Sequence, residues 1–111
     1  MQEKEPLEIY RLQAELCKAL SDPKRLRIIS ELRGGERTVS ELVDILGLKQ
    51  SNTSQHLSVL RRIGLIVFRK QGSTVYYRLA NPKIGEACDM VHQVLADQLQ
   101  RNNALARVLE T

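Results

Sequence analysis

The spacing of apolar residues along this chain changes its period twice, at Gly64 and again at Pro82. Before Gly64, apolar residues recur every three or four positions in short runs that end at glycine or at a Ser-Asp-Pro step, and this period predicts helices. Residues 65–70 are β-branched and apolar, and after a Gly-containing turn residues 74–79 alternate, which together predicts the two strands of a β-hairpin. The helical period then resumes, so we expect a mainly α-helical chain with one small β-hairpin.

Four helices are expected before the hairpin and one after it, in the order α-α-α-α-β-β-α. Asp22 or Ser21 is expected to cap the second helix, and Thr38 with Glu41 forms a capping-box pattern at the start of the third. The expected helices span residues 6–20, 23–33, 38–46, 51–63 and 81–107, and the expected strands 65–70 and 74–79. The side chains predicted to be buried on the second and fourth helices are Leu26, Ile29, Leu32, Thr53, Leu57, Leu60 and Ile63.

The positive charge is concentrated in one segment. The whole chain has 17 Lys and Arg against 13 Asp and Glu, a formal net charge of +4. Residues 49–78 hold six of the basic residues and no acidic one, so the rest of the chain is slightly acidic. A basic stretch without acids is the electrostatic pattern of a nucleic-acid-binding surface. The alternative is a solvated basic face with no partner, although such a face normally intersperses acids with its cations.

The length of 111 residues predicts a single domain, residues 1–111, with a thin core that dimerisation would supplement. So small a chain, without an evident acid–base or nucleophile constellation, is not expected to be an enzyme. Its first ten residues, MQEKEPLEIY, are charged and lack the apolar core of a signal peptide, and no apolar run approaches the ~20 residues that span a bilayer. We therefore expect a cytoplasmic protein with no membrane partner and no cofactor.

The start of the fourth predicted helix is polar over seven consecutive residues, Gln50–His56. Amide and hydroxyl side chains at the beginning of a helix are suited to reading base edges in the major groove, and the free N–H groups there attract phosphate. The alternative is capping plus a solvated face: Ser51 could be only a cap, and His56 could contact DNA or pack beside the hairpin. Because this run lies within the acid-free segment, we favour DNA contact.

Two short helices joined by a tight turn and followed by a basic hairpin constitute a winged helix-turn-helix, in which residues 38–79 would read DNA. Basic side chains at the end of the fourth helix and on the hairpin are expected to contact phosphates, which positions a protein without reading sequence. These basic residues are Arg61, Arg62, Arg69 and Lys70. The predicted DNA-binding set is Lys49, Gln50, Ser51, Asn52, Ser54, Gln55, His56, Arg61, Arg69 and Lys70.

Three stretches resemble the ArsR/SmtB family of bacterial and archaeal repressors. Lys18–Ile29 (KALSDPKRLRII) resembles the opening signature of that family, and Gln50–Leu60 (QSNTSQHLSVL) resembles its recognition helix. Gly64–Ile66 with Arg69–Leu79 (RKQGSTVYYRL) resembles its wing. The resemblance covers nearly the whole chain, in order. It implies a homodimer built on the first and last helices, a double-stranded operator DNA with an inverted repeat, and repression relieved by an inducer.

The resemblance does not extend to the usual metal sites of the family. Where many members carry two cysteines in the third helix, this chain has Glu41–Ile45 (ELVDI). At the positions of a second kind of site, in the last helix, it has Asn81, Lys83, Val94 and Asp97. Asparagine and valine are poor ligands and a lysine repels a cation, so neither site is expected, and His92 stands alone on its helix.

Cys17 and Cys88 lie on the predicted apolar stripes of the first and last helices. In the family these helices pack together at the dimer interface, so the two thiols can approach each other within or between subunits. A dithiol there could be oxidised, persulfidated or bridged by a thiophilic ion such as arsenite, which makes the pair a candidate sensor. The alternative is that both are small hydrophobic residues filling the interface.

The favoured function is a homodimeric DNA-binding repressor released from its operator by a thiophilic metalloid, reactive sulfur or an oxidant. The alternative is a constitutive winged-helix DNA-binding or interaction module with no effector. A pure interaction module would expose an apolar patch in place of a polar helix. An RNA-binding module usually exposes aromatic residues for stacking. The aromatic residues here are mostly in core-like positions: Tyr10, Phe68, Tyr76 and Tyr77.

Overall fold

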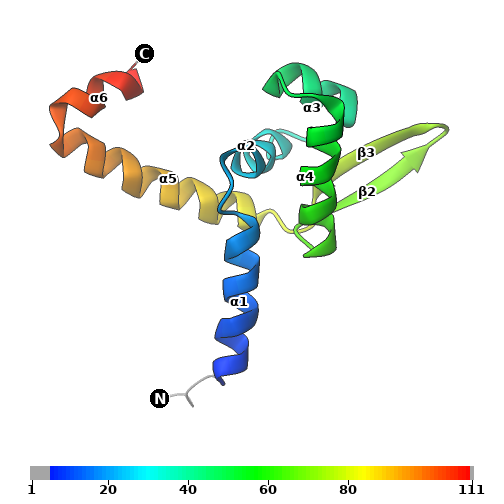
Figure 1. The fold of residues 1–111 in the computed structure, drawn as a ribbon, viewed down its shortest axis with the longest axis horizontal. Helices are drawn as coiled ribbons and strands as arrows, with labels where there is room; N and C mark the ends of the chain where they lie inside the picture. The colour runs from blue at the N-terminus through cyan, green and yellow to red at the C-terminus, as the bar shows by residue number, and fades with distance from the viewer. Residues whose placement is uncertain (1–5, 111) are drawn as a thin grey trace.

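The computed structural model describes residues 6–110, except for the side chains of residues 103–106. Residues 1–5 and 111, which the sequence assigns to the same domain, lie outside the described part. The elements are α1 (Leu7–Ala19), α2 (Pro23–Leu32), β1 (Arg37–Thr38), α3 (Val39–Leu46), α4 (Gln50–Arg62), β2 (Ile66–Gln71), β3 (Thr74–Leu79), α5 (Lys83–Arg101) and α6 (Asn103–Glu110). In Figure 1, α2, α3 and α4 pack beside the hairpin as a head, and α1 and α5 extend away from it in two directions.

The head is a winged helix-turn-helix, which confirms the predicted fold class. Its core lies between α2, α3, α4 and the root of the hairpin. Ile28 and Ile29 of α2, Leu42 of α3, and Leu57 and Leu60 of α4 are each exposed by 1% or less. The buried side of α4 is the one predicted from its apolar spacing. Its opposite side is therefore free to face a partner.

One predicted core position on α2 is wrong. Leu26 is 41% exposed, whereas its neighbour Ile28, which was not predicted to be buried, is fully enclosed. Helix α2 is contacted by α5 as well as by α3, α4 and β3, so it is covered on more than one side. The apolar spacing alone does not indicate on which side a second contacting helix lies.

Both predicted helix caps are present. The Asp22 carboxylate accepts hydrogen bonds from the backbone N–H groups of Lys24 at 2.8 Å and Arg25 at 3.2 Å. At the start of α3, the Thr38 hydroxyl accepts from the backbone N–H of Glu41 at 3.1 Å, and the Glu41 carboxylate accepts from that of Thr38 at 2.8 Å. These caps fix the points at which two of the head helices begin.

The sheet has three strands in the order β1-β3-β2 and not the two that were predicted. In the hairpin, Gln71 pairs with Thr74 across a two-residue turn whose first residue, Gly72, has φ +63. The additional strand, β1, pairs Thr38 with Tyr76 and Arg37 with Tyr77. A strand of two residues has no alternation from which it could be recognised, and Thr38 also caps α3.

The helix expected over residues 81–107 is divided into α5 and α6. Asn102 interrupts it with extended backbone angles, φ −110 and ψ 95. Asparagine side chains compete for nearby backbone hydrogen bonds, and Asn102 is followed by a second asparagine. The apolar spacing continues across this break and so does not reveal it.

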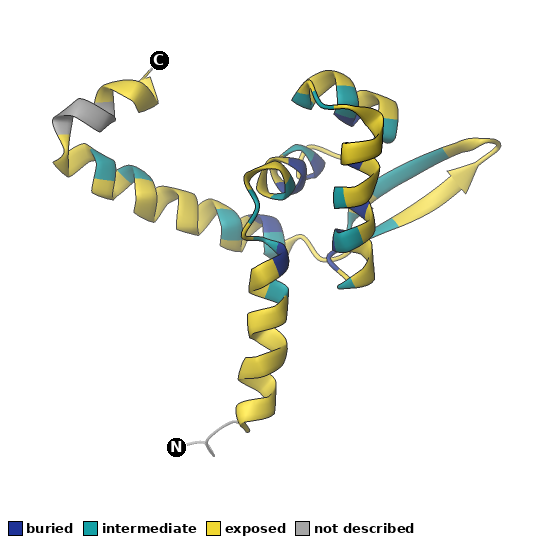
Figure 2. Cartoon of the chain, in the orientation of Figure 1, coloured by how far each residue is buried: buried dark blue, intermediate teal, exposed yellow. Residues whose placement is uncertain are grey.

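The described part of the chain is not compact. Its radius of gyration is 16.4 Å, against about 13 Å for a compact chain of this length. Figure 2 shows that α1 and α5 are exposed along most of their length. Large apolar side chains on them are solvent-exposed: Leu7, Ile9, Tyr10, Leu12, Met90, Val91, Val94 and Leu95. No helix in the described part is long and apolar enough to cross a membrane.

Candidate nucleic-acid interface

Helix α4 divides its polar run between two sides. Thr53 is fully buried, and its hydroxyl donates to the backbone carbonyl of Lys49 at 3.1 Å. Because this donor is satisfied, a polar side chain can lie in the core without a large desolvation cost. The other uncharged side chains of the first two turns are exposed: Gln50, Ser51, Asn52, Ser54 and Gln55. Five of the predicted DNA-binding residues are therefore brought to one open surface.

The N-terminus of α4 is open. Gly47 ends α3 in the left-handed conformation with φ +68, and Lys49 is the N-cap of α4 without a side-chain hydrogen bond to the helix. No acidic residue lies in the first turn. Ser51 lies inside the helix, which excludes its interpretation as the cap. Free backbone N–H groups at a helix start, with no acid beside them, favour the approach of an anion.

His56 is held against α2 and not against the hairpin. Its Nδ1 lies 3.2 Å from Nη1 of Arg25, and Nε of Arg25 donates to the backbone carbonyl of Ala19 at 2.5 Å. A guanidinium is always a donor, so this contact assigns the acceptor role to Nδ1 and places the proton of a neutral imidazole on Nε2. His56 therefore joins α4 to α2, a contact that sequence spacing could not indicate.

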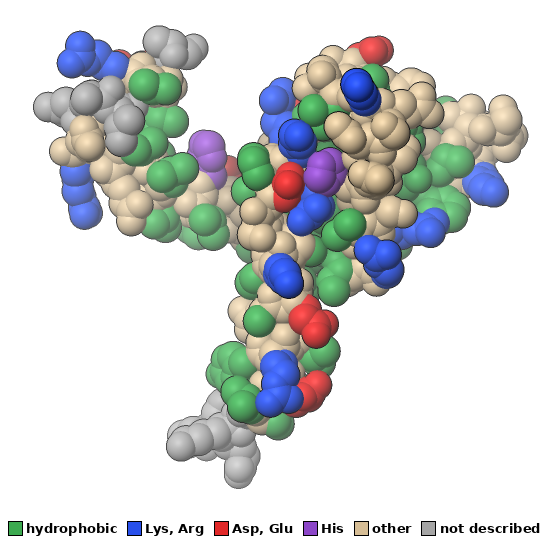
Figure 3. All heavy atoms as spheres, viewed as in Figure 1, with side chains coloured by type: hydrophobic (Ala, Val, Ile, Leu, Met, Phe, Trp, Pro, Cys, Tyr) green, Lys and Arg blue, Asp and Glu red, His purple; other side chains and the backbone are tan. Residues whose placement is uncertain are grey.

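The basic residues of the predicted interface differ in their surroundings. The Arg61 guanidinium lies over the Phe68 ring, 5.0 Å from its centroid. Lys49 and Lys70 are exposed. Arg69 is bound by Glu36, with Nε donating to one carboxylate oxygen at 2.8 Å and Nη2 to the other at 2.9 Å. Figure 3 shows mostly uncharged polar surface over α4, with Lys and Arg side chains beside it and along the hairpin.

The basic segment is free of acids in sequence but not in space. Glu36 lies outside residues 49–78 and reaches β2 because β1 pairs with β3, next to β2. A hydrogen bond from Arg69 lowers the pKa of Glu36, although slight burial acts to raise it, and the charges of Arg69 and Arg78 lower it further. Glu36 is therefore ionised at neutral pH and offsets part of the positive charge of the hairpin. The strand β1, which brings it there, was not predicted.

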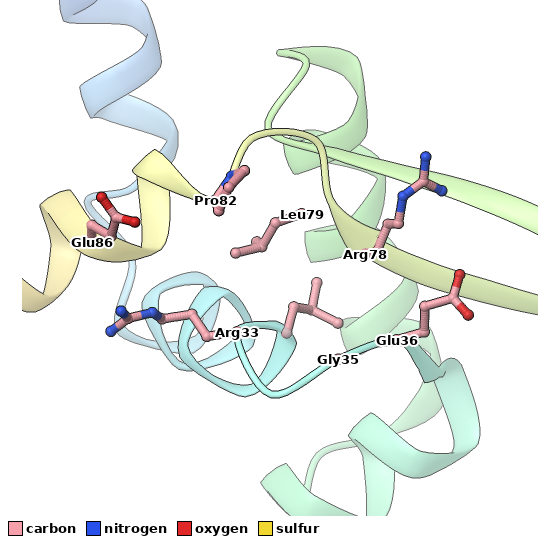
Figure 4. Close-up of a pocket in the computed structure, with 8 residues that line it drawn as sticks. Arg33, Gly35, Glu36, Arg78, Leu79, Pro82 and Glu86 are labelled. Atoms are coloured by element: carbon pink, nitrogen blue, oxygen red, sulfur yellow. The ribbon is translucent and has the colours of Figure 1, made fainter.

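Grooves open on the surface of the head. One of them, of 520 Å³, lies between α2 and α4 and is lined in part by Arg25, Ser58 and Arg62. A second groove, of 360 Å³, lies where α2, β3 and α5 meet. Figure 4 shows Arg33 and Glu86 toward one end of this second groove and Arg78 and Glu36 toward the other. The alternation of cations and anions leaves the second groove without the uniform positive charge that suits an anion.

The two cysteines are free and lie near the head end of α1 and α5. Cys17 is exposed, and Cys88 is half-buried against the core. Burial raises the pKa of the Cys88 thiol; the charge of Arg33 lowers it, and Cys17 raises it. The two thiols are therefore within electrostatic reach of each other in one chain. Within residues 6–110, no three His, Cys, Asp or Glu side chains are grouped so that they could hold a metal ion.

The family model described as bacterial regulatory protein, arsR family, matches residues 22–67. Among curated relatives, the uncharacterised HTH-type transcriptional regulator Rv0081 of Mycobacterium tuberculosis is 43% identical over 95 residues, which cover 85% of this chain and 82% of that protein. The repressor SmtB of M. tuberculosis is 42% identical over 76 residues, 68% of this chain and 56% of that protein. The transcriptional activator HlyU of Vibrio cholerae is 39% identical over 79 residues, which cover 71% of this chain and 73% of that protein.

Solved structures give the same fold. The crystal structure of Rv0081 has a TM-score of 0.77 and 41% identity, and the match covers 89% of this chain and 98% of that one. The homodimeric winged helix-turn-helix domain of Mb0332 from Mycobacterium bovis, solved by NMR as a possible ArsR-family regulator, has a TM-score of 0.79 and 28% identity. That match covers 90% of this chain and 93% of the other.

Proposed function

Since this chain belongs to the ArsR family of DNA-binding transcriptional regulators, we propose that it is a homodimeric repressor that binds an inverted-repeat operator and leaves it when an inducer binds. Members of this family are regulators and not enzymes. The observation that carries the proposal is the exposed polar side of α4, whose opposite side is locked into the core by Thr53, Leu57 and Leu60. Such a helix presents hydrogen-bonding groups at a fixed orientation, as base reading requires.

The exposed apolar side chains of α1 and α5 support the homodimer. The described chain has 8210 Å² of accessible surface, against about 6200 Å² for a compact protein of its mass. The additional exposed surface includes the apolar side chains of Leu7, Tyr10, Val91 and Leu95. Apolar surface of this extent is normally buried against a partner. The similar Mb0332 domain is homodimeric. A second copy packed on these helices would cover this surface and set two α4 helices about one DNA turn, roughly 34–36 Å, apart.

The similarity to SmtB, which is named a repressor, supports repression. The similar protein HlyU is named an activator, so the direction of regulation has to be tested. Footprinting on the DNA upstream of its own gene, followed by transcription in vitro from that DNA, tests the proposal. We expect two-fold symmetric protection and less transcript as protein is added. More transcript would identify an activator. No protection at any concentration would refute DNA binding.

Cys17 and Cys88 remain the candidate sensor. Cys88 packs against the core near the start of α5, and Cys17 lies near the end of α1. These positions support the role, because oxidation, persulfidation or arsenite bridging there would alter the packing of the helices that set the spacing of the two heads. To release DNA, the effector must bind free dimer more tightly than DNA-bound dimer. Cys17→Ser and Cys88→Ser should then bind DNA normally and lose the response to arsenite, persulfide or oxidant.

If the double serine variant is released from DNA by the same compound at the same concentration as wild type, the cysteines are only packing residues. If none of the three compounds releases wild type, the constitutive module without an effector is the correct function. Mass spectrometry of the treated wild type provides a separate readout, because a sensor requires both thiols to be modified or joined.

A further inference from the structure

The groove between α2 and α4 brings basic side chains from two helices next to side chains that are predicted to read bases. It is lined by Arg25 and Arg62, which come from different helices, and by the Ser58 hydroxyl. Ser54 and Gln55, which are predicted to read bases, line the same groove. An anion bound there would therefore lie directly beside the base-reading side chains.

Arg25 is held in a fixed position at this groove. Its Nε donates to the carbonyl of Ala19 at the end of α1, and its Nη1 donates to Nδ1 of His56 on α4. A guanidinium has five N–H donors, so about three of them are left for a ligand. A cation whose side chain is already ordered loses little entropy on binding, which favours it as a phosphate ligand.

The charge facing the groove is positive. Arg25 and Arg62 supply this charge, and Nδ1 of His56 lies at hydrogen-bond distance from Nη1 of Arg25. Asp22 is the acid near Arg25, and its carboxylate is turned to the backbone N–H groups of Lys24 and Arg25. Burial acts to raise the pKa of Asp22, but those hydrogen bonds and the neighbouring His56 and Arg25 together lower it below its ordinary value. The acid is thereby occupied as a helix cap and leaves both guanidinium groups available.

We propose that this groove is the binding site for one phosphodiester group of the DNA backbone, which Arg25, Arg62 and the Ser58 hydroxyl contact. The inference rests on the proposed DNA-binding function and adds Arg25, at the start of α2, to the interface. The groove is open to solvent, as a phosphate that stays part of a large duplex requires. A phosphate fixed here sets the register of α4 on the duplex, so that Ser54 and Gln55 meet the same base edges each time.

The test is the salt dependence of binding to a short fluorescent duplex of random sequence. The slope of log K against log salt is negative, and each lost phosphate contact makes it shallower by about 0.9, so Arg62→Ala or Arg25→Ala should make it shallower by about 2 for a dimer. Arg27→Ala is the matched control. It lies on the same helix as Arg25, carries the same charge and pairs with Glu31 at 3.5 Å. Its slope should stay at the wild-type value.

The possible outcomes distinguish a failure of the proposed phosphate-binding site from a failure of the proposed DNA-binding function. If wild type does not bind duplex DNA, the proposed function fails. If wild type binds and Arg62→Ala keeps the wild-type slope, the proposed phosphate-binding site is wrong and the DNA-binding function is retained. Arg25→Ala also removes a contact between three helices, so the thermal unfolding of this variant is measured as well. If Arg25→Ala is unfolded, the slope of Arg62→Ala alone tests the proposal. Inorganic phosphate added at constant ionic strength should not displace the duplex; displacement that Arg62→Ala abolishes would assign the groove to a small anion.

Discussion

Arg69 of β2 and Glu36 form a two-pronged ion pair between the hairpin and the segment before β1. The two closest contacts are 2.8 and 2.9 Å, and the guanidinium also lies over the Tyr76 ring, 4.5 Å from its centroid. Its Nη1 donates to the Gln71 amide oxygen at 2.8 Å. A side chain expected from sequence to contact DNA phosphate is thus already occupied by a carboxylate. Phosphate must compete with Glu36 for it.

Glu36→Gln should strengthen binding to duplex DNA of any sequence. The substitution removes the competing charge, while Tyr76 and Gln71 still hold Arg69 in place. The salt slope should steepen by about 1 per protomer, the value for one gained phosphate contact. The measurement is a titration with operator and random duplexes across a salt series. Glu31→Gln, which removes a carboxylate paired with Arg27 on α2, is the control and should have no effect. Weaker binding by Glu36→Gln would mean that the ion pair positions Arg69 for DNA.

Lys70→Ala should weaken binding to operator and random DNA about equally and make the negative salt slope shallower by about 1 per protomer. Lys70 is exposed on β2 beside Arg69, and a phosphate contact carries no sequence information. The same titrations measure both effects. A loss confined to the operator would contradict the assignment of the hairpin to phosphate contacts.

Ser54→Ala and Gln55→Ala should reduce sequence discrimination. Both side chains are exposed on α4, and one lost base contact costs on the order of 1–3 kcal/mol of discrimination. The quantity to measure is the ratio of operator affinity to random-duplex affinity. Ser40→Ala, an exposed serine of α3, serves as the control. If both α4 variants retain the wild-type ratio, the base-reading surface lies elsewhere.

Asp22→Ala should lower the free energy of unfolding by about 1 kcal/mol, as expected for a lost N-cap. Asp22→Asn keeps an acceptor for the N–H groups of Lys24 and Arg25 but has no charge. Because the pKa of Asp22 lies below its ordinary value of 3.8, the carboxylate contributes its stability above that pH and loses it as the pH falls through the folded-state pKa. The advantage of wild type over Asp22→Asn should therefore be present at neutral pH and vanish in acid. Chemical denaturation across pH measures it, and an advantage that grows in acid would be inconsistent with this account.

The sequence predicts local structure best where a position requires a particular kind of side chain, as the N-cap of a helix does. Helix starts need a side-chain acceptor, so Thr38 and one of Ser21 or Asp22 were expected as caps, and the structure has Thr38 and Asp22 in these roles. The sequence did not indicate β1, because two residues have no period, or the interruption at Asn102, because the apolar stripe continues through it. The spacing predicts an apolar stripe on α1 but does not indicate what covers it, and its residues Leu7 and Tyr10 are exposed in the structure.

The candidate site was predictable in its composition but not in its pairings. The side of α4 that faces outward follows from Thr53, Leu57 and Leu60, whose spacing places them together on the buried side. The contacts of Arg25 with His56 and of Glu36 with Arg69 join residues 31 and 33 positions apart. Such contacts arise only once the helices and strands have packed, so the charge available to DNA could not be read from the segment alone.

Selection of bound duplexes from a random library tests the central claim most directly. If two protomers read DNA through α4, the enriched sequence is an inverted repeat whose half-site centres lie about 10–10.5 base pairs apart, and the complex contains two protein chains. A single asymmetric half-site bound by one chain, or no enrichment over the starting library, would contradict the claim.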